Sequence, residues 1–248
     1  MAKTILITGA GRGIGAATAL MAAERGYQVC VNYLKNKNAA MEVVNKIQNK
    51  GGKAIACQAD VSVEQEVSRL FKQVDEELGT LDALVNNAGI LSTQARADEL
   101  TAERLQYIFN ANVISSFLCA KEAIKRMSIK YGGTGGGIVN VSSIAARTGS
   151  PNEYIDYAAS KGAIDTFTLG LAKEVAEENI RVNAVRPGFI YTDIHADGGE
   201  PGRVDRIKDS LPMKRGGRPE EVARAILWLL SDESSFSTGT FIDITGGR

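Results

Sequence analysis

Residues 8–15 read TGAGRGIG and decide the fold of this 248-residue chain. They follow the β-branched run KTILI at residues 3–7 and open an apolar-periodic stretch at Ile14, so a strand ends and a helix begins at these glycines. Gly9, Gly13 and Gly15 let the backbone turn tightly and approach a phosphate, whose charge the N-terminus of the helix stabilises. The stretch predicts a βαβ unit with a pyrophosphate site; turn glycines of an ordinary loop are the alternative.

The rest of the chain repeats this alternation of short strands and longer amphipathic helices. We expect strands at residues 3–8, 28–33, 53–59, 81–85, 138–141, 181–185 and 240–244. We expect helices at residues 14–25, 39–49, about 62–78, about 102–130, about 154–178 and 219–230. Continuous apolar runs such as ILIT and ALV are typical of parallel strands covered on both faces. The pattern predicts an α/β fold, a single doubly wound Rossmann-like domain over residues 1–248 with a seven-stranded parallel sheet.

Two local patterns give further expectations. Ser62 and Gln65 have the spacing of a capping box, which predicts a helix start there. Residues 191–218 contain GGEPG and RGG and are longer than most connections inside a compact domain. We expect this segment, about 191–218, to be a substrate lid.

Composition excludes several classes of protein. The chain has 29 Lys and Arg against 29 Asp and Glu, so no net field recruits nucleic acid or an acidic membrane surface. Cys30, Cys57 and Cys119 lie far apart in apolar contexts without metal-ligand spacing, as in a core kept reduced. No signal segment and no apolar run of about 18 residues is visible. We expect a cytoplasmic protein with a small-molecule partner and no metal.

The second strand indicates which dinucleotide would bind. An NAD-binding Rossmann fold carries an acid at its end, about 20 residues after the glycines, for the ribose hydroxyls. Here that stretch is NYLKNKN, beginning at Asn32 and Tyr33, and it has no acid. Arg12 and Lys35 instead offer positive charge to a ribose phosphate. This favours NADP(H) over NAD(H), the alternative being a solvated arginine and lysines.

Further motifs follow in a fixed order: NNAG at residues 86–89, Asn112, the VSS that ends at Ser143, and Tyr157 with Lys161 in YAASK. With TGAGRGIG and the final TGTFIDITGG, they resemble the short-chain dehydrogenase/reductase family, in its TGxxxGxG variant, over the whole chain. Within that family the chain is similar to bacterial reductases of the glucose dehydrogenase and 3-oxoacyl-carrier-protein reductase types. Ser143 and Tyr157 are 14 positions apart where many relatives have 13, so no relative's substrate transfers directly.

The resemblance implies a catalytic tetrad of Asn112, Ser143, Tyr157 and Lys161. Tyr157 and Lys161 lie four apart on a helix and share a face. A free phenol has a pKa of about 10, and a desolvated ammonium that lowered it by about 3 units would supply about 4 kcal/mol. Ser143 would bind the substrate oxygen, with Ser142 as its rival, since alternation lets only one face the cleft. By resemblance, Asn112 would interrupt its helix locally and hold a proton-relaying water.

Other positions carry over from the family as expected cofactor contacts. Lys161 would also hold the nicotinamide ribose, and Asp60 would meet the adenine edge unless it caps a helix. The expected contacts are Gly9, Gly11, Arg12, Gly13, Ile14, Gly15, Asn32, Tyr33, Lys35, Asp60, Val61, Asn87, Ala88, Gly89, Tyr157, Lys161, Pro187, Gly188, Ile190 and Thr192. The only histidine, His195, falls in the lid segment and is expected to be a loop residue.

These residues predict an NADP(H)-dependent oxidoreductase that passes a hydride between nicotinamide and a carbonyl or secondary alcohol of a small substrate. The alternatives are a 3-oxoacyl-thioester reductase and a catalytically silent NADP(H) sensor. For a sugar or polyol, the candidate hydroxyl-binding residues are Asn152, Glu153, Asp197 and Glu200. For a carrier-protein thioester, the candidate basic rim is Lys125, Arg126, Lys130 and Lys173, which also suit a solvated helix face. The resemblance implies a homotetramer, and the apolar AILWLL run around Trp228 agrees with one.

Overall fold

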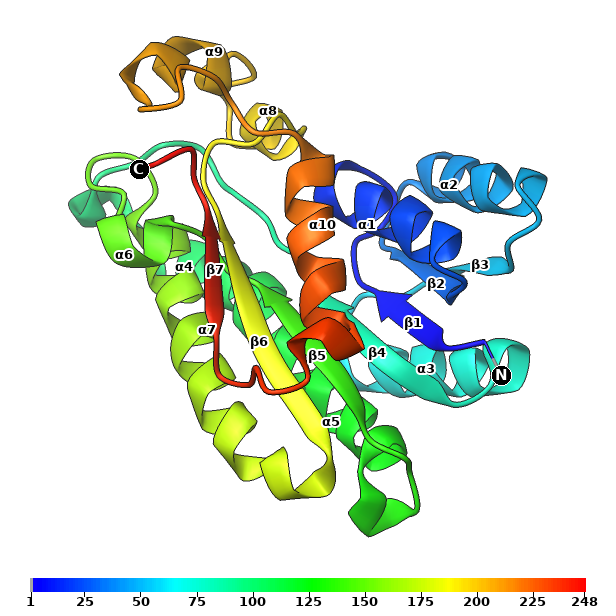
Figure 1. The fold of residues 1–248 in the computed structure, drawn as a ribbon. Helices are drawn as coiled ribbons and strands as arrows, with labels where there is room; N and C mark the ends of the chain where they lie inside the picture. Colours follow the sequence, from blue (N-terminus) through cyan, green and yellow to red (C-terminus); the bar gives the residue numbers. More distant parts are fainter. Residues whose placement is uncertain (1) are drawn as a thin grey trace.

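A seven-stranded parallel sheet forms the centre of the protein (Figure 1). The computed structural model describes residues 2–248. From one edge to the other the strands follow the order β3, β2, β1, β4, β5, β6, β7. Their bounds are β1 Thr4–Ile7, β2 Gln28–Tyr33, β3 Ala54–Gln58, β4 Leu81–Asn86, β5 Gly136–Val141, β6 Ile180–Pro187 and β7 Phe241–Ile244. The predicted doubly wound, Rossmann-like α/β fold is confirmed. The strand order reverses direction at β1, where a crevice opens between β1 and β4.

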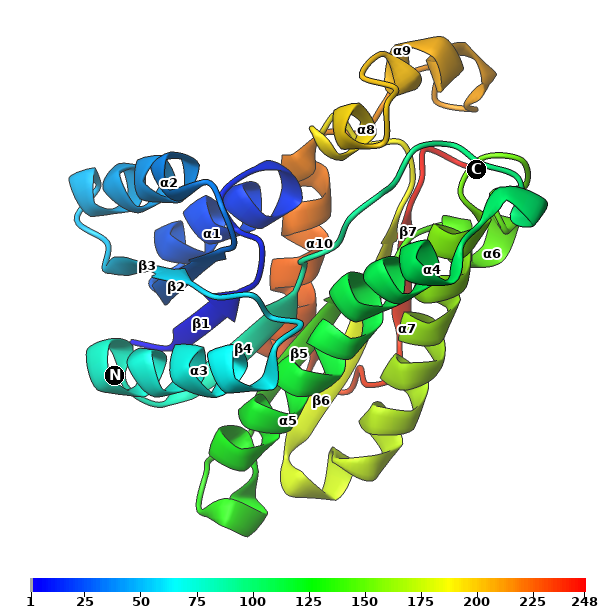
Figure 2. The ribbon, with the colours of Figure 1, turned by 180° about the vertical axis from the view of Figure 1, so that it is seen from behind.

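Helices cover both faces of the sheet, as Figures 1 and 2 show from opposite sides. One face carries α1 Gly13–Glu24, α2 Lys37–Asn49 and α10 Pro219–Leu230, and the other carries α3 Glu64–Leu78, α5 Ser115–Met127 and α7 Ile155–Glu174. Side chains alternate along the strands: Ile5 and Ile7 pack with the first set of helices, and Leu6 packs with the second. Both faces of each central strand are therefore apolar.

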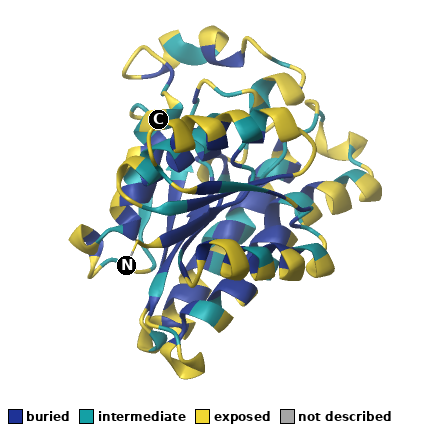
Figure 3. Ribbon diagram, turned by 90° about the vertical axis from the view of Figure 1, so that its right-hand side faces the viewer, coloured by how far each residue is buried: buried dark blue, intermediate teal, exposed yellow. Residues whose placement is uncertain are grey.

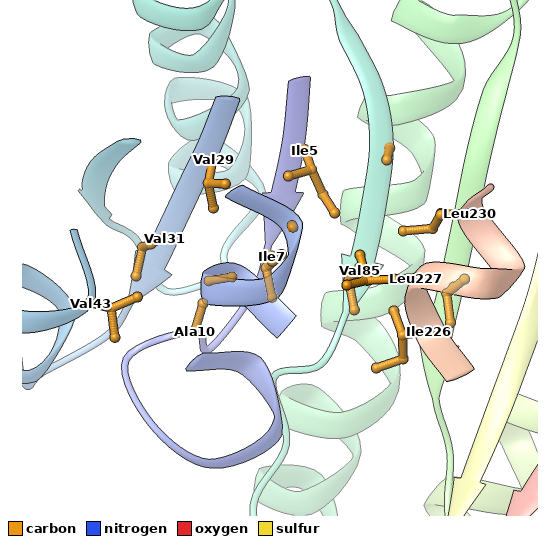
Figure 4. Packing of buried hydrophobic residues seen from close by; sticks show 14 of the residues in the cluster. Ile5, Ile7, Ala10, Val29, Val31, Val43, Val85, Ile226, Leu227 and Leu230 are labelled. Carbon is orange, nitrogen blue, oxygen red and sulfur yellow. The ribbon is translucent and has the colours of Figure 1, made fainter. Parts of the chain in front are cut away.

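The core consists of two apolar layers, one on each side of the sheet. Burial is highest along the strands, and the exposed residues lie on the outer sides of the helices (Figure 3). Figure 4 shows the layer beneath α1 and α10, where Ile226 and Leu227 face Val85. The three cysteines are buried and free, in agreement with their expected place in the core.

The helix expected over residues 102–130 is interrupted around Asn112, as the family resemblance implied. The structure has α4 Ala102–Phe109, a π-helical turn over Asn110–Ile114, and then α5, followed by a short 3-10 turn at Ile129–Tyr131. The wider π turn admits an additional residue, and it directs the Asn112 side chain to the backbone of Ile90 after β4. A polar anchor therefore overrides a continuous α-helical pattern.

Two other boundaries differ from the sequence pattern. The expected capping box of Ser62 and Gln65 is wrong, because α3 begins at Glu64 and no side chain caps it. The Ser62 hydroxyl donates to Asp60, 2.6 Å away, and Glu66 accepts the Asp60 backbone N–H at 2.7 Å. The expected helix at 154–178 is split into α7 and a 3-10 turn at Ala176–Glu178.

Short helices lie beyond the carboxyl ends of the strands (Figure 1). They are α6 Ala145–Thr148, α8 Ile194–Asp197 and α9 Arg203–Ile207. α8 and α9 belong to the segment 191–218, which contains helical turns rather than an irregular loop. Within residues 2–248 no helix has the length and apolarity to cross a membrane. The same residues contain no cluster of three side chains suited to a metal ion.

Candidate active site

A cleft of about 1180 Å³ opens at the carboxyl edge of the sheet. The glycine turn lies at one end, and Ser143, Tyr157 and Lys161 line its middle. All of the expected cofactor contacts line it except Gly15. Asn112 does not line the cleft but lies behind Gly89, where an added Cβ would be 3.4 Å from its Oδ1 and 3.5 Å from Lys161 Nζ. The fold thus brings the four residues of the expected tetrad together.

The glycine turn depends on backbone conformations that other residues rarely adopt. Gly9 and Gly13 have φ of +62° and +55°. A Cβ on Gly15 would lie 2.5 Å from Asn87 Nδ2 and 2.8 Å from the Gly9 carbonyl, which explains why Gly15 packs behind the turn and does not line the cleft. The first turn of α1 has no capping side chain and no acidic residue, so its N–H groups remain available to an anion.

The end of β2 lacks an acid, as the sequence indicated, but two of the expected contacts have other partners. Asn32 is buried; its Oδ1 accepts from Gly9 N, and its Nδ2 donates to the carbonyls of Cys57 and Ala59. It therefore holds the glycine turn to β3. Asp60 accepts hydrogen bonds from the Ser62 backbone and hydroxyl at 2.9 and 2.6 Å.

Positive charge does lie at this end of the cleft. Lys35 and Arg12 both line it. The Arg12 guanidinium forms an ion pair with Asp197 of α8, so one of the two expected phosphate ligands contacts the lid segment. This contact was not visible in the sequence, because 185 positions separate the two residues.

The two serines at the end of β5 face opposite ways. Ser142 is 2% exposed, and its hydroxyl donates to Asp165 at 2.6 Å. Ser143 lines the cleft, accepts the Ala145 N–H at 3.1 Å, and interacts with the Tyr157 hydroxyl. Both residues border the cleft, but the Ser142 hydroxyl is already donated to Asp165, which leaves Ser143 as the serine that can meet a substrate.

Tyr157 and Lys161 share one face of α7, but the ammonium lies over the phenol ring, 5.5 Å from its centroid. Lys161 is 4% exposed and its Nζ donates to the Val141 carbonyl at 2.8 Å. Burial lowers the pKa of Lys161 to about 8. Burial also raises the pKa of Tyr157, while Ser143 and Arg203 lower it to a smaller extent. The acidified phenol expected from the spacing is therefore wrong for this arrangement, since desolvation outweighs the nearby charges.

The π turn joins the Tyr157 helix to the loop after β4. Asn112 accepts the Ile90 N–H at 2.7 Å and donates to the Ile90 carbonyl at 3.1 Å and to Ser160 Oγ at 3.1 Å. Ser160 in turn donates to the Tyr157 carbonyl at 2.7 Å. The sequence analysis missed Ser160, although its position inside YAASK was a signal.

The opposite end of the cleft is built around a buried arginine that the sequence analysis also missed. The Arg203 guanidinium lies 4.6 Å from the Tyr154 ring centroid and 5.5 Å from that of Phe189. It forms ion pairs with Glu153 and Glu200, and its side chain is 6% exposed. The partners span 50 positions, so only the folded chain reveals the cluster.

Only two of the four residues considered for binding a sugar or polyol line the cleft. Glu153 and Asp197 line the cleft, but Asn152 and Glu200 do not, and the three carboxylates already pair with arginines. His195 lies in the helix α8 rather than in a loop and lines the cleft. Its Nε2 is 3.0 Å from the Ile190 carbonyl, and burial lowers its pKa.

The four residues considered as a basic rim do not line the cleft, in agreement with the alternative of a solvated helix face. α5 and α7 run back from the carboxyl edge, so their last turns lie at the edge where strands begin, away from the cleft. The residues concerned are Lys125, Arg126, Lys130 and Lys173. Two of them are neutralised: Glu122 pairs with Lys125 at 2.7 Å and with Arg126 at 2.9 Å.

Curated relatives align with nearly the whole chain. An oxidoreductase of Escherichia coli, "Uncharacterized oxidoreductase YgfF", is 60% identical over 98% of this chain and 98% of its own. "Glucose 1-dehydrogenase 2" of Bacillus subtilis is 38% identical over 99% and 94%. A "3-oxoacyl-[acyl-carrier-protein] reductase" of Synechocystis is 39% identical over 99% and 96%.

A family model and a solved structure agree with these relatives. The model described as "Enoyl-(Acyl carrier protein) reductase" matches residues 9–248. A short-chain type dehydrogenase/reductase from Mycobacterium marinum superimposes with a TM-score of 0.91 at 36% identity, covering 98% of this chain and 94% of its own. Fold, cleft and relatives therefore lead to one assignment: this chain belongs to the short-chain dehydrogenase/reductase family of oxidoreductases.

Proposed function

We propose that the protein is an NADP(H)-dependent oxidoreductase that transfers a hydride between nicotinamide and a carbonyl or secondary alcohol of a small substrate. One observation carries the proposal: Ser143 and Tyr157 line the same continuous cleft as the glycine turn. A proton donor and a dinucleotide site therefore share one cavity, as hydride transfer to a carbonyl requires.

The residues at the glycine end fit a nicotinamide dinucleotide. The uncapped first turn of α1 suits the pyrophosphate. A Cβ on Gly9 would lie 3.1 Å from the Ala88 Cα, so the glycine lets the loops after β1 and β4 approach each other closely. Thr8 Oγ1 accepts the N–H groups of Asn87 and Ala88 at 3.0 and 2.9 Å, which fixes the two cofactor-facing loops to each other. When bound, the nicotinamide supplies the hydride chemistry.

The protein side chains then supply binding and proton transfer. Tyr157, whose pKa is raised by burial, stays protonated near neutral pH and can donate its hydroxyl proton to a carbonyl oxygen. Ser143 donates a hydrogen bond to the same oxygen as negative charge develops there. Lys161, as an ammonium, stabilises the phenolate left on Tyr157. For alcohol oxidation these steps run in reverse.

NADP(H) preference is supported by Arg12, Lys35 and the absence of an acid at the end of β2. Titration by quenching of protein fluorescence should give a lower Kd for NADPH than for NADH. Equal dissociation constants would contradict the preference. Arg12→Gln should weaken NADPH binding and leave NADH binding nearly unchanged.

The substrate class that we propose is small carbonyls and alcohols, including sugars and polyols. Similarity to the Synechocystis protein supports a 3-oxoacyl-thioester substrate, although the four residues expected to form a basic rim lie away from the cleft. A screen of NADPH oxidation over sugars, diketones, acyl thioesters and aromatic ketones separates these classes.

We also propose that residues 191–218 close the substrate end of the cleft. Tyr154 donates its hydroxyl to the Gly198 carbonyl at 3.3 Å, which joins the lid segment to the cleft wall.

We further propose that the protein is a homotetramer. The outer faces of α5 and α7 expose Phe117 and Leu169, at 46% and 43%, as a subunit interface would require. Sedimentation should give four chains, and a monomer at micromolar concentration would contradict this.

Tyr157→Phe tests the function itself. The variant should bind NADPH as the native protein does and lose turnover by about 10²- to 10⁴-fold, because the phenylalanine ring has no proton to give. Tyr131→Phe, at an exposed position after α5, is the matched control and should keep full activity. Tight NADPH binding without turnover of any carbonyl by the native protein would favour the silent sensor.

A further inference from the structure

Asp165 lies one helical turn after Lys161 on α7, outside the expected tetrad. Its Oδ1 accepts the Ser142 hydroxyl at 2.6 Å, and the same hydroxyl is 3.2 Å from the Lys161 carbonyl. Its Oδ2 accepts from Arg186 Nε at 2.9 Å. The Asp165 side chain is 15% exposed, so this carboxylate is held in one orientation on the buried side of the catalytic helix.

Arg186 fixes the carboxylate from β6. Its guanidinium stacks 3.9 Å from the Phe241 ring centroid and also reaches Asp243 of β7 at 3.5 Å. Arg147 after β5 binds the other side of Asp243 at 2.8 Å. The two arginines and two aspartates balance in charge, so Asp165 is a negative end of a neutral cluster rather than an isolated buried anion.

Asp165 and Lys161 meet neighbouring residues at the end of β5: Lys161 Nζ donates to the Val141 carbonyl, and Asp165 accepts the hydroxyl of Ser142, the next residue. From this position the charge of Asp165 raises the pKa of Lys161. From its own helix Lys161 also faces Tyr157, which is neutral when protonated. From β5 it meets the Val141 carbonyl, and from the loop after β4 and the π turn it meets Gly89 and Asn112. None of these groups carries a full negative charge, so the charge that offsets the burial of the ammonium comes from Asp165, in competition with Arg186, the partner of that carboxylate.

We propose that Asp165 is a positioning residue for the reaction: held by Ser142 and Arg186 one turn of α7 after Lys161, its carboxylate keeps Lys161 in the ammonium form beneath Tyr157. The inference deepens the proposed function, since the ammonium is what stabilises the Tyr157 phenolate. Burial lowers the pKa of Lys161 to about 8, and the charge of Asp165 opposes that shift. Removal of the charge should therefore take the lysine below its present pKa.

The first test does not require turnover. The protein is labelled with ¹³C-lysine, and the ¹³Cε resonance of Lys161 is identified by its loss in Lys161→Arg. In Asp165→Asn, which keeps an acceptor for Ser142, the titration midpoint of Lys161 should fall by about one pH unit. Asp243→Asn is the matched control, because it removes a carboxylate from the same cluster without contact to α7, and its midpoint should stay unchanged. Equal midpoints in Asp165→Asn and the native protein would overturn the proposal.

The second test uses the rate of carbonyl reduction. The reaction requires the protonated Lys161, so activity falls as pH rises through its pKa, and Asp165→Asn should move this alkaline limb to lower pH by about the same amount. If Asp165→Asn does not fold, the charge-balanced pair Asp165→Asn with Arg186→Gln replaces it, and a limb that stays in place overturns the proposal. A native protein without turnover would defeat the proposed function while leaving the NMR test intact.

Discussion

The two ends of the cleft are built in different ways. At the glycine end, backbone conformation makes the site: Gly9 and Gly13 have positive φ, and Gly15 leaves no room for a Cβ. At the substrate end, charged side chains form the site: Arg203 lies between Tyr154 and Phe189 and pairs with two glutamates. The first kind of site is visible in a short stretch of sequence, and the second only in the folded chain.

The largest effect should come from a methyl group at the glycine end. In Gly15→Ala the new Cβ would overlap Asn87 Nδ2 and the Gly9 carbonyl, and we expect a loss of about 3 kcal/mol in the free energy of unfolding. Gly170→Ala lies at an exposed position near the end of α7, where an added Cβ has no atom within 4 Å, and should be neutral or stabilising. Urea denaturation measures both. Equal stability of the two variants would show that the glycine turn can adjust.

Next in size is the effect of charge at the substrate end. Arg203→Met should raise KM for a carbonyl substrate about tenfold, or about 1.4 kcal/mol, and leave the Kd of NADPH unchanged, because the lid segment loses its buried anchor. Arg206→Met removes a guanidinium that contacts the same glutamates but is 54% exposed, so it should change KM less. A rise in the Kd of NADPH equal to the rise in KM would show that the two ends are not separate.

The pH dependence of stability tests how Lys161 titrates in the middle of the cleft. The pKa of Lys161 falls from 10.5 to about 8 on folding, so between these values the unfolded chain binds more protons and stability rises with pH. Relative to Lys161→Met, the native protein should gain roughly 1–2 kcal/mol between pH 8 and pH 9.5. Urea titrations at both pH values measure the difference. Parallel curves for the two proteins would mean that Lys161 titrates normally.

The smallest effect should come from the ion pair between Arg12 at the glycine end and Asp197 of the lid segment. Asp197→Asn releases Arg12 for the ribose phosphate, and we expect the Kd of NADPH to fall about threefold with that of NADH unchanged. Fluorescence titration of both cofactors measures the change. A weaker affinity for NADPH would indicate that Asp197 orients Arg12 instead of competing for it.

Sequence reasoning succeeded where local chemistry decides the structure. The alternation of apolar runs predicted the parallel sheet, and the motifs correctly grouped Ser143, Tyr157 and Lys161 in the cleft that the glycine turn lines. It failed where distant residues meet. The partners of Arg203 and Arg12 and the raised pKa of Tyr157 all depend on tertiary packing. The interrupted helix at Asn112 was expected only by resemblance.

The π turn at Asn110–Ile114 makes the number of residues in this helix critical. Deletion of one residue within it would restore ordinary α-helical winding, and α4 and α5 would keep nearly the same mutual orientation, because the π turn already takes up one additional residue. The widened turn would be lost, and with it the hydrogen bonds of Asn112 to Ile90 and Ser160. Substitutions in this stretch change single contacts, whereas a change in residue count would remove the support that the π turn gives to the wall beside Tyr157.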